Sequence, residues 1–583
     1  MTHTTVPEIF TFLSRRQFVA GLAGSALLSA ALIRRSAAAT PGAATLAGTA
    51  FELEIGAVEV DFTGRRRSAT VVNGRLPGPV LRWREGDSVS LRVTNRLAVP
   101  TSIHWHGMIV PADMDGVPGL SFHGIAPGAS YLYRFRVNQS GTYWYHSHSR
   151  FQEQTGLYGA IVVTPRGGER HPTERDYTVL LSDWSDVDPE HIYHLLKVHP
   201  SYFNLGQRTV GELLADAHRQ GWQATLAERG MWGRMRMDPT DLADVSSYAY
   251  TYLMNGVTPA GNWTGLFQRG ERVRLRFING SSMSFFDVRI PGLKLQVIAA
   301  DGQDVEPVSV DEFRIGAAEV LDVIVQPADR PYTIFAQSID RSGYACGTLA
   351  PRAGMRAEIP VLDPRPLLSL TDMGMAAGME AGGPAAMVGM AHDMSSMAMA
   401  GAGAQHAAAD YGPTVDMQAM QPQTRLDDPG VGLRDNGRRV LTYFDLHTLG
   451  GSIDSRSPAR DIELHLTGHM QRFVWSFNGQ KFSASEPLRF DLGERLRLVL
   501  VNDSMMHHPI HLHGMWGEVL SERGDFLVRK HTITVQPGQR LAYAVTADAL
   551  GRWAYHCHLL YHMEAGMFRE VVVQRMGGAD RPT

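Results

Sequence analysis

An alternating pattern of apolar and polar residues follows a glycine-acid pair in the stretch Glu85-Gly86-Asp87-Ser88-Val89-Ser90-Leu91-Arg92-Val93-Thr94-Asn95. A period of two predicts a strand with one face buried and one face in water. The pattern returns between Arg269 and Asn279 and again between Leu492 and Asn502. An asparagine-glycine pair precedes each copy, at Asn73-Gly74, Asn255-Gly256 and Asn478-Gly479. We therefore expect one β-sandwich unit to occur three times along the chain.

The interval between the second and third copies is the longer one, and a low-complexity segment accounts for it. Between Met373 and Met420 lie ten of the 26 methionines, among Gly and Ala with His392, Asp393 and His406. Such a composition buries too little fixed apolar surface to offset the ordering entropy, so it predicts a flexible linker. A helical period between Val210 and Met237 predicts a smaller helical insert.

Length and composition limit the classes of protein. With 583 residues the chain exceeds the size of one hydrophobic core, so three or four domains are expected. A net charge of -4 offers no basic field for nucleic acid, which we exclude as a partner. Only two cysteines are present, Cys346 and Cys557, so no disulfide framework is expected. Cys346 is by default a buried free thiol.

The N-terminus has the pattern of an export signal. Ser14-Arg15-Arg16-Gln17-Phe18-Val19 leads into an apolar run that ends at Ile33, and small residues follow at Ala37-Ala38-Ala39. The run is shorter than the roughly 20 residues that span a bilayer, so no stable membrane span is expected. Residues 1–40 resemble a twin-arginine signal peptide, which implies a periplasmic protein.

Four motifs concentrate the histidines near the two ends of the chain: His104-Trp105-His106-Gly107, His146-Ser147-His148, His508-Pro509-Ile510-His511-Leu512-His513-Gly514, and His556-Cys557-His558 followed by His562 and Met567. On a strand, residues two apart point to the same face, so each His-x-His pair presents two imidazoles to one metal cluster. The first and third units carry these motifs, and the second unit lacks them. One such pair alone is weak evidence of a metal site, because exposed histidines on strands are common.

Cys557 must point away from the two histidines beside it and towards a different metal. A cysteine with two histidines and a distant methionine is the ligand set of a blue-copper site, which His508, Cys557, His562 and Met567 provide. An electron that arrives at Cys557 then has only one peptide to cross to reach His556 or His558. Eight imidazoles plus this separate set do not fit a structural zinc site of four ligands.

At these motifs the chain resembles the multicopper oxidases, from about Gly48 to Arg575. The resemblance implies an all-β fold of three cupredoxin-like Greek-key β-sandwich domains at residues 45–168, 172–365 and 435–578. The Met-rich insert, residues 366–430, would lie before or within the third domain. It also implies four copper ions, one type 1, one type 2 and two type 3. Four one-electron oxidations at type 1 copper would then be matched to the reduction of one O2 to water.

The resemblance also implies a role for each histidine. His104 and His511 would hold the type 2 copper. One type 3 copper would take His106, His146 and His558, and the other would take His148, His513 and His556. Asp115 matches the position of an acid near the cluster in bacterial members, and with Cys557 it is our candidate catalytic residue. Asp115 also fits an ordinary turn before Gly116. Met563 follows His562 where some relatives have an acid, which leaves the second proton donor open, with Glu564 next in the chain.

Within the family the chain most resembles the periplasmic copper-resistance oxidases of the CopA type, through its N-terminus, its Met-rich insert and the stretch from Met231 to Met237. That resemblance implies oxidation of Cu(I), which thioether ligands favour, with other copper-handling proteins as further partners. Four more methionines would suit Cu(I) uptake or ordinary core packing: Met505, Met506, Met515 and Met563. Two alternatives stay open, a laccase-like oxidation of phenols and a copper-sequestering binding protein. A copper nitrite reductase is disfavoured because it lacks the type 3 set.

Overall fold

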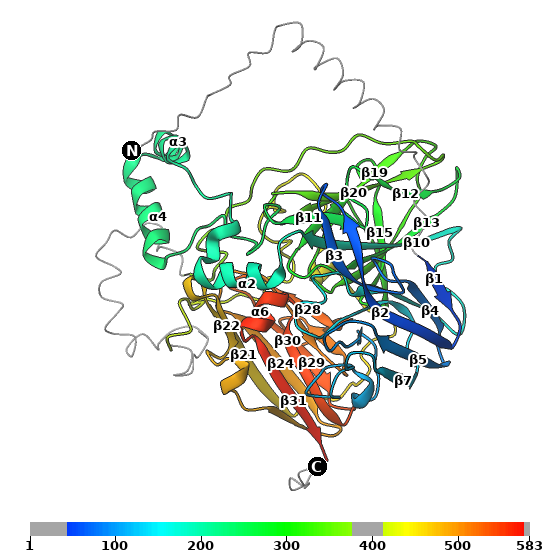
Figure 1. Cartoon of the computed structure of the whole chain (residues 1–583). Coiled ribbons are helices and arrows are strands. Elements are labelled where there is room, and N and C mark those ends of the chain that lie inside the picture. Colours follow the sequence, from blue (N-terminus) through cyan, green and yellow to red (C-terminus); the bar gives the residue numbers. More distant parts are fainter. Residues whose placement is uncertain (1–43, 376–411, 576–583) are drawn as a thin grey trace, which may run out of the picture. The chain divides into compact units, whose positions relative to one another are not determined.

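The computed structural model describes residues 44–375 and 412–575. These residues form six β-sheets that make three successive β-sandwiches, coloured blue, green and yellow to red in Figure 1. The predicted all-β fold of three cupredoxin-like sandwiches is confirmed. Within the described ranges, no helix has the length and apolar character needed to cross a membrane. The expected signal peptide lies outside these residues.

The first sandwich pairs a sheet in the order β3-β2-β5-β7 with a sheet in the order β1-β4-β9-β8-β6. A short 3-10 helix, η1 (Ala112–Met114), lies between β6 and β7. The strands of the first sandwich are β1 (Thr45–Ala47), β2 (Ala50–Asp61), β3 (Arg66–Val72), β4 (Val80–Arg84), β5 (Ser88–Asn95), β6 (His104–His106), β7 (Ser130–Arg136), β8 (Gly141–His146) and β9 (Tyr158–Thr164).

The second sandwich pairs a sheet in the order β11-β10-β13-β18-β15-β16 with one in the order β12-β20-β19-β14-β17. Its strands are β10 (Arg175–Ser185), β11 (Tyr250–Met254), β12 (Trp263–Leu266), β13 (Val273–Asn279), β14 (Phe286–Arg289), β15 (Leu295–Ala300), β16 (Gln303–Val310), β17 (Glu312–Ile315), β18 (Val320–Val325), β19 (Tyr332–Ser338) and β20 (Tyr344–Ala350).

The third sandwich has the sheet orders β22-β21-β24-β29-β26-β27 and β23-β31-β30-β25-β28. Three 3-10 helices belong to it, η4 (Tyr443–Asp445), η5 (Met470–Arg472) and η6 (Phe482–Ala484). Its strands are β21 (Arg460–His469), β22 (Val474–Phe477), β23 (Leu488–Asp491), β24 (Arg495–Asn502), β25 (His508–Leu512), β26 (Gly517–Leu520), β27 (Phe526–Lys530), β28 (Thr532–Val535), β29 (Arg540–Thr546), β30 (Gly551–Cys557) and β31 (Phe568–Gln574).

The strand orders show which strands of the second sandwich correspond to the strands that carry histidines in the other two. β25 and β30 of the third sandwich correspond in sheet order to β6 and β8 of the first and to β14 and β19 of the second. The first and third pairs carry the histidines, whereas β14 and β19 read Phe-Asp-Val-Arg and Tyr-Thr-Ile-Phe-Ala-Gln-Ser. The repeated scaffold is therefore present three times, and the metal-ligand chemistry is present on two of its copies.

The asparagine that ends each repeated strand has the same structural role. Asn95, Asn279 and Asn502 are fully buried, and each Nδ2 donates to one backbone carbonyl oxygen in the loop that follows its strand and to a second one farther along the chain. A buried amide needs such partners to offset its desolvation. The repeated asparagine thus fixes the loop that leads into β6, β14 or β25.

The prediction of one wet face holds for β5 but is wrong for β13 and β24, in which the polar residues are also largely buried. In β13 the Arg276 guanidinium is 1% exposed, because its Nε lies 2.7 Å from Asp176 Oδ1 and its Nη1 bonds Thr142 of the first sandwich. In β24 the Nη2 atom of Arg495 lies 2.6 Å from Glu518 Oε2. Neighbouring elements and ion pairs therefore cover the faces that were expected to meet water.

Among residues 44–375 and 412–575, the α-helices are α2 (Pro189–Val198), α3 (Val210–Gln220), α4 (Trp222–Met235) and α6 (Leu560–Ala565). α3 and α4 confirm the predicted helical insert, which Gly221 divides in two. The edges of the predicted linker pack on the core through Leu370, Met373 and Met417, while residues 376–411 lie outside the described part. Cys346 is a buried free thiol, as expected, and burial raises its pKa to about 11.

Candidate metal centres

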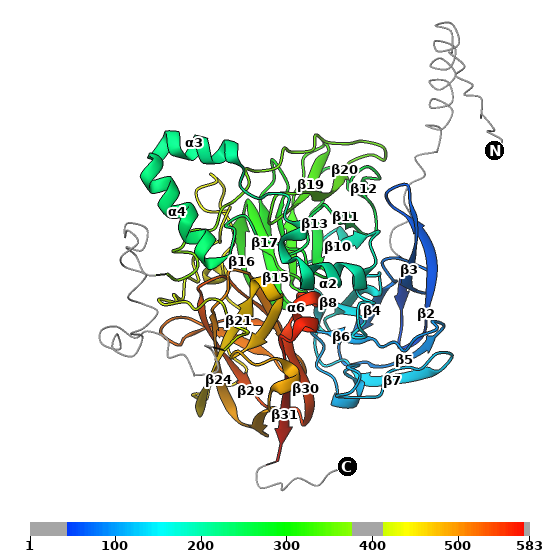
Figure 2. The same ribbon diagram turned by 60° about the vertical axis from the view of Figure 1, so that its left-hand side comes forward.

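Two pairs of neighbouring strands bring eight histidines together. β6 lies beside β8 with His104 opposite His146, and β25 lies beside β30 with His511 opposite His556. Figure 2 shows β6 and β8 close to β30 and α6. Rings from the first and third sandwiches stack on each other, with centroids 4.0 Å apart for His104 and His513. We call this set the histidine cluster: His104, His106, His146, His148, His511, His513, His556 and His558.

The outer contacts of the cluster leave lone pairs that need a cation. His104 Nδ1 donates to the Asp115 carbonyl oxygen at 2.8 Å, and His511 Nδ1 donates to the His531 carbonyl oxygen at 2.6 Å. Each proton is therefore on Nδ1, and the Nε2 atom of each ring is buried without a hydrogen-bond partner. Unpartnered buried acceptors are costly, and a bound metal ion satisfies both.

A second observation points to the same conclusion. His513 Nδ1 donates to Asp115 Oδ2 at 2.8 Å, and His556 Nδ1 donates to the Cys557 carbonyl oxygen at 2.9 Å. Both Nε2 atoms therefore carry lone pairs, yet they lie only 3.1 Å apart. His148 Nε2 lies 3.3 Å from His556 Nε2. Nitrogen lone pairs that face each other repel unless a cation lies between them, so this donor set fits a metal.

The lowered pKa values of the cluster histidines favour metal binding as well. Burial, followed by neighbouring imidazoles, lowers the pKa of most cluster histidines well below its ordinary value. Burial lowers the pKa of His556 to about 4. The rings are therefore neutral near pH 7, which is the form that donates to a metal ion.

A separate donor set lies on the other side of the Cys557 main chain. Cys557 Sγ is 3.5 Å from His508 Nδ1 and 3.8 Å from His562 Nδ1, and the two nitrogens are 3.2 Å apart. Met567 is fully buried beside them, and its carbonyl oxygen accepts the Cys557 N–H. Burial raises the pKa of the Cys557 thiol, so a thiolate here requires a compensating cation.

The two histidines of this set are closed off from solvent. His508 and His562 are both 0% exposed. His508 Nε2 bonds Ser504 Oγ at 2.7 Å, and His562 Nε2 donates to Asp244 Oδ2 at 2.8 Å. Trp475 stacks on His562 with ring centroids 3.9 Å apart. These contacts fix both rings with Nδ1 facing the sulfur.

Both donor sets lie in parts of the chain that are similar to known proteins. Multicopper oxidase family models match residues 54–168, 175–353 and 455–577. The chain belongs to the multicopper oxidase family. The oxidase therefore binds copper as its cofactor, with one type 1, one type 2 and two type 3 ions, and couples oxidation of a reductant to reduction of O2. Copper supplies the one-electron chemistry, and the protein holds and orients it.

Two bacterial relatives are similar to the oxidase over nearly its whole length. The copper resistance protein A homolog of Pseudomonas syringae pv. tomato is 58% identical, over 96% of this chain and 99% of the relative. Copper resistance protein A of Escherichia coli is 54% identical with the same coverage. The solved structure of Fet3p, a multicopper oxidase that functions in iron import, has a TM-score of 0.63 at 18% identity and covers 91% of each chain. That last likeness concerns the fold.

The sequence suggested two positions for Asp115, a turn before Gly116 and a place near the metal cluster, and the structure shows both. Asp115 ends η1 at a turn before Gly116, and its carboxylate is 1% exposed beside the histidine cluster. Oδ2 accepts from His513, while Oδ1 lies 3.3 Å from His104 Nδ1. The turn and the contact with the cluster are thus compatible, and the catalytic role of Asp115 stays a prediction.

Three residues in contact with the histidine cluster or the cysteine set were not singled out from the sequence. Glu153 Oε2 lies 2.6 Å from His146 Nδ1, and burial raises its pKa well above the ordinary value. His531 Nδ1 lies 3.2 Å from His106 Nε2, although this histidine belongs to no His-x-His pair. Asp244 reaches His562 from the loop before β11. Only the short distance of Glu153 from His148 along the chain could have suggested any of them.

The remaining candidates pack in the hydrophobic core or line a cavity. Met505, Met506 and Met515 are at most 2% exposed and belong to the hydrophobic core. Glu564 forms an ion pair with Arg150. Met563 and Glu564 line a cavity of about 570 Å³ that also reaches His148. The cavity therefore extends to one ring of the histidine cluster.

Proposed function

We propose that the oxidase converts Cu(I) to Cu(II), so that four Cu(I) ions and four protons reduce one O2 to two water molecules. The two bacterial relatives named for copper resistance, each more than half identical over 96% of the chain, support this choice of substrate. The observation that carries the proposal is the environment of His562, because it decides which reductants can approach.

That environment suits a cation better than a phenol. His508 and His562 have no exposed ring edge on which a phenol could lie. The outward nitrogen of His562 is held instead by the Asp244 carboxylate. Asp241 is also buried, and burial, with Asp244, Asp238 and Asp340, raises its pKa well above its ordinary value. A cation that arrives at these acids relieves their repulsion, and Asp244 then links it to the type 1 ligand.

We further propose the ligand assignment given by the family pattern. Type 1 copper takes His508, Cys557, His562 and axial Met567, and type 2 copper takes His104 and His511. The type 3 pair takes His106, His146 and His558, and His148, His513 and His556. The grouping of His148, His513 and His556 within 4.8 Å, and of His508, Cys557 and His562, supports this assignment. Electrons would pass from Cys557 through the adjoining peptides to His556 and His558.

The domain boundaries and the location are proposals too. Domains at 45–168, 172–365 and 435–578 agree broadly with the ranges matched by the family models. The proposed twin-arginine signal at 1–40 would deliver the folded oxidase to the periplasm, where copper resistance would involve other copper-handling proteins. The Met-rich insert would collect Cu(I) through its soft thioethers.

The test compares reductants and one variant. Asp244→Asn keeps the size of the side chain but removes its charge. We expect kcat/KM for Cu(I) to fall at least about ten-fold, with a smaller change for a phenol. Asp461→Asn, which removes an exposed carboxylate paired with Arg497 on β24, is the matched control and should match the parent.

The alternatives are outcomes of the same experiment. A parent enzyme that oxidises phenols faster than Cu(I) in excess copper favours a laccase and contradicts the proposal. A variant that lacks residues 376–411 tests the collecting role, because unchanged oxidation of Cu(I) at low concentration would exclude it. Copper survival that persists when His558→Ala abolishes O2 uptake would favour sequestration.

A further inference from the structure

We propose that Asp301, which belongs to the sandwich without copper ligands, is a positioning residue for His511 and acts through the peptide group that joins His531 to Thr532. The inference rests on the proposed assignment of His511 to type 2 copper. Asp301 lies in the turn between β15 and β16 and is 0% exposed. Its Oδ2 accepts the backbone N–H groups of His531 and Thr532, each at 3.1 Å.

The peptide group explains how Asp301 can act at a distance. The His531 carbonyl and the Thr532 N–H belong to one planar unit, so holding one end fixes the direction of the other. The N–H end donates to Asp301, and the carbonyl end accepts from His511 Nδ1 at 2.6 Å. β28 also pairs with β25, with Thr532 opposite His511. Asp301 therefore sets the carbonyl that keeps the His511 proton on Nδ1 and leaves Nε2 for copper.

The negative charge of Asp301 strengthens the effect of this hydrogen-bond geometry. A carboxylate on the N–H side polarises the peptide, and in a buried chain of hydrogen bonds each bond strengthens the next. The His531 carbonyl thus becomes a stronger acceptor, which makes the His511 imidazole a stronger electron donor to a metal. This arrangement resembles a carboxylate-histidine-metal triad with a peptide group inserted between the carboxylate and the histidine.

The same segment also supports a second cluster histidine. Thr532 Oγ1 lies 3.0 Å from His106 Nε2, and His531 Nδ1 lies 3.2 Å from the same nitrogen. One carboxylate of the second sandwich therefore holds the backbone of a segment that contacts both a proposed type 2 ligand and a proposed type 3 ligand. This is a physical reason for the second sandwich to lie against the other two.

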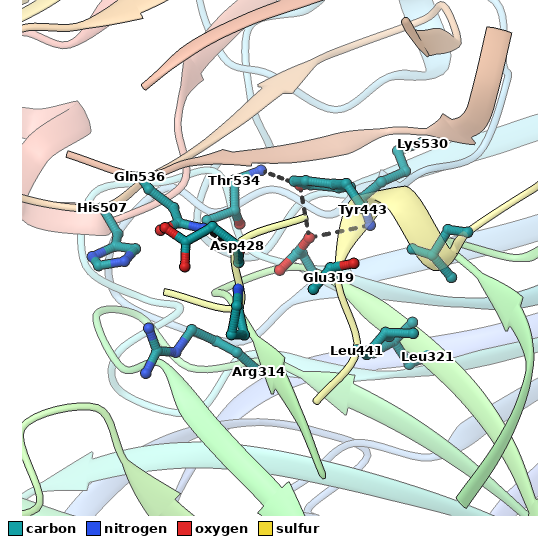
Figure 3. Close-up of a pocket in the computed structure, with 13 residues that line it drawn as sticks. Arg314, Glu319, Leu321, Asp428, Leu441, Tyr443, His507, Lys530, Thr534 and Gln536 are labelled. Atoms are coloured by element: carbon teal, nitrogen blue, oxygen red, sulfur yellow. Dashed lines mark hydrogen bonds and ion pairs between the residues drawn. The ribbon is translucent and has the colours of Figure 1, made fainter. Parts of the chain in front are cut away.

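Glu319 provides a matched control, because Glu319 and Asp301 both form an ion pair with Lys530. The Lys530 ammonium is 2% exposed and lies 3.2 Å from Asp301 Oδ2 and 3.1 Å from Glu319 Oε1. Figure 3 shows Glu319 between Lys530 and Tyr443 at a cavity of about 80 Å³. Both carboxylates neutralise the same ammonium, but Glu319 accepts hydrogen bonds from the Gly316 N–H and the Tyr443 hydroxyl, whereas the His531–Thr532 peptide donates to Asp301. Glu319→Gln therefore removes a charge beside Lys530 and leaves the hydrogen bonds between the His531 and Thr532 N–H groups and Asp301 intact.

The test compares Asp301→Asn with Glu319→Gln, each as the copper-loaded protein. Asn has the shape of Asp and tolerates the backbone φ of 46° found at this position. In Asp301→Asn we expect an altered type 2 hyperfine splitting in electron paramagnetic resonance and a loss of type 2 copper to a chelator that is about ten-fold faster. The blue absorption should be unchanged, and Glu319→Gln should match the parent in all three measurements.

Unchanged splitting and chelation in Asp301→Asn, or equal changes in Glu319→Gln, would overturn the inference. A parent without a type 2 signal would overturn the ligand assignment as well, so the two failures are distinguishable. A second measurement needs no variant. Removing type 2 copper from the parent should speed amide exchange in residues 526–535, and equal exchange with and without that copper would contradict the role of the peptide.

Discussion

The outer nitrogen of an imidazole decides what its inner nitrogen can do. His104 and His511 donate to carbonyl oxygens, and His513 donates to the Asp115 carboxylate, so each presents an Nε2 lone pair to the cluster. These acceptors lie in loops and at strand ends far from the ligands in sequence. The motifs therefore predict which residues are candidate ligands, whereas the packing of other segments determines the tautomer of each imidazole.

Cys557→Ser tests the separate roles of the two donor sets. A serine hydroxyl stays protonated and is a hard donor, so it cannot replace the thiolate at type 1 copper. We expect complete loss of the blue absorption and of substrate oxidation, with the type 2 resonance retained because His556 and His558 keep their places. Visible and resonance spectra check this. Loss of both signals together would contradict two separable centres.

Asp115→Asn tests the proposed proton-delivery role. Asn can still accept the hydrogen bond from His513, so copper should stay bound while the ionisable group is removed. We expect kcat to fall by about 100-fold or more, in the range of lost general acid catalysis, at an unchanged copper content. Asp113→Asn, at an exposed position two residues earlier, is the control. A fall in copper content equal to the fall in rate would instead assign Asp115 a purely structural role.

At the scale of elements, β8 and β30, which carry His146 and His556, each begin at a glycine that lies against another part of the chain. Gly141 begins β8 at a φ of 121°, and a Cβ there would lie 2.1 Å from the Gly302 carbonyl oxygen of the second sandwich. Gly551 begins β30 at a φ of 137°, and its Cβ would meet Ala112 at 2.5 Å. These two glycines, five residues before His146 and His556, allow the close approach that assembles the cluster.

Gly141→Ala should therefore destabilise the oxidase through two terms. The positive φ costs about 1–2 kcal/mol, and the clash adds about 1–3 kcal/mol. Gly48→Ala is the control, because Gly48 has a similar φ of 128° but open space around its Cβ position. Denaturant unfolding should give a larger loss for Gly141→Ala. Equal losses would show that the close approach carries no free-energy cost.

The segment that leads into the third sandwich should make stability depend on pH. Burial raises the pKa of Asp416 from 3.8 to about 7, while its Oδ2 accepts the Met470 N–H. The folded chain thus holds this proton more tightly than the unfolded chain. The contribution of this bound proton to the free energy of unfolding is full below about pH 4. It is lost as the pH rises to about 7, at up to about 1.4 kcal/mol per pH unit.

Asp416→Asn has no proton to lose and can still accept from Met470. Relative to the parent it should gain stability progressively between about pH 4 and pH 7, with a constant advantage above that. Denaturant midpoints measured over this range provide the test. A difference between variant and parent that does not change with pH would contradict the burial of an ionisable Asp416.

For the whole molecule, the sequence predicts the features that recur as local patterns, and it misses the contacts that form when distant segments pack together. Alternating strands and the His-x-His motifs have local periods, so three sandwiches and the candidate ligands could be predicted before the structure. Asp244 and His531 contact the proposed ligands, and Asp301 contacts the segment beside them, only after distant segments fold together, and no local pattern marks these three residues. The buried faces of β13 and β24 were misjudged for the same reason, since their cover comes from other parts of the chain.

The second sandwich has the repeated fold without the ligands, and its contribution becomes visible only in the whole molecule. Thr142 of the first sandwich bonds Arg276 and Asp322, and Asp301 holds the segment beside His511 and His106. A middle domain placed in this way braces the two domains that share the histidine cluster. Its repeated fold thus has a structural role that its own sequence motifs do not reveal.

The central claim is that His556-Cys557-His558 joins a type 1 centre to a three-copper cluster. A copper count combined with visible and paramagnetic resonance spectra of the oxidised protein tests it most directly. We predict four copper ions per chain, a blue absorption, and resonance from half of the copper, because the coupled type 3 pair is silent. Resonance from all of the bound copper, or a blue absorption with a single copper ion per chain, would contradict the account.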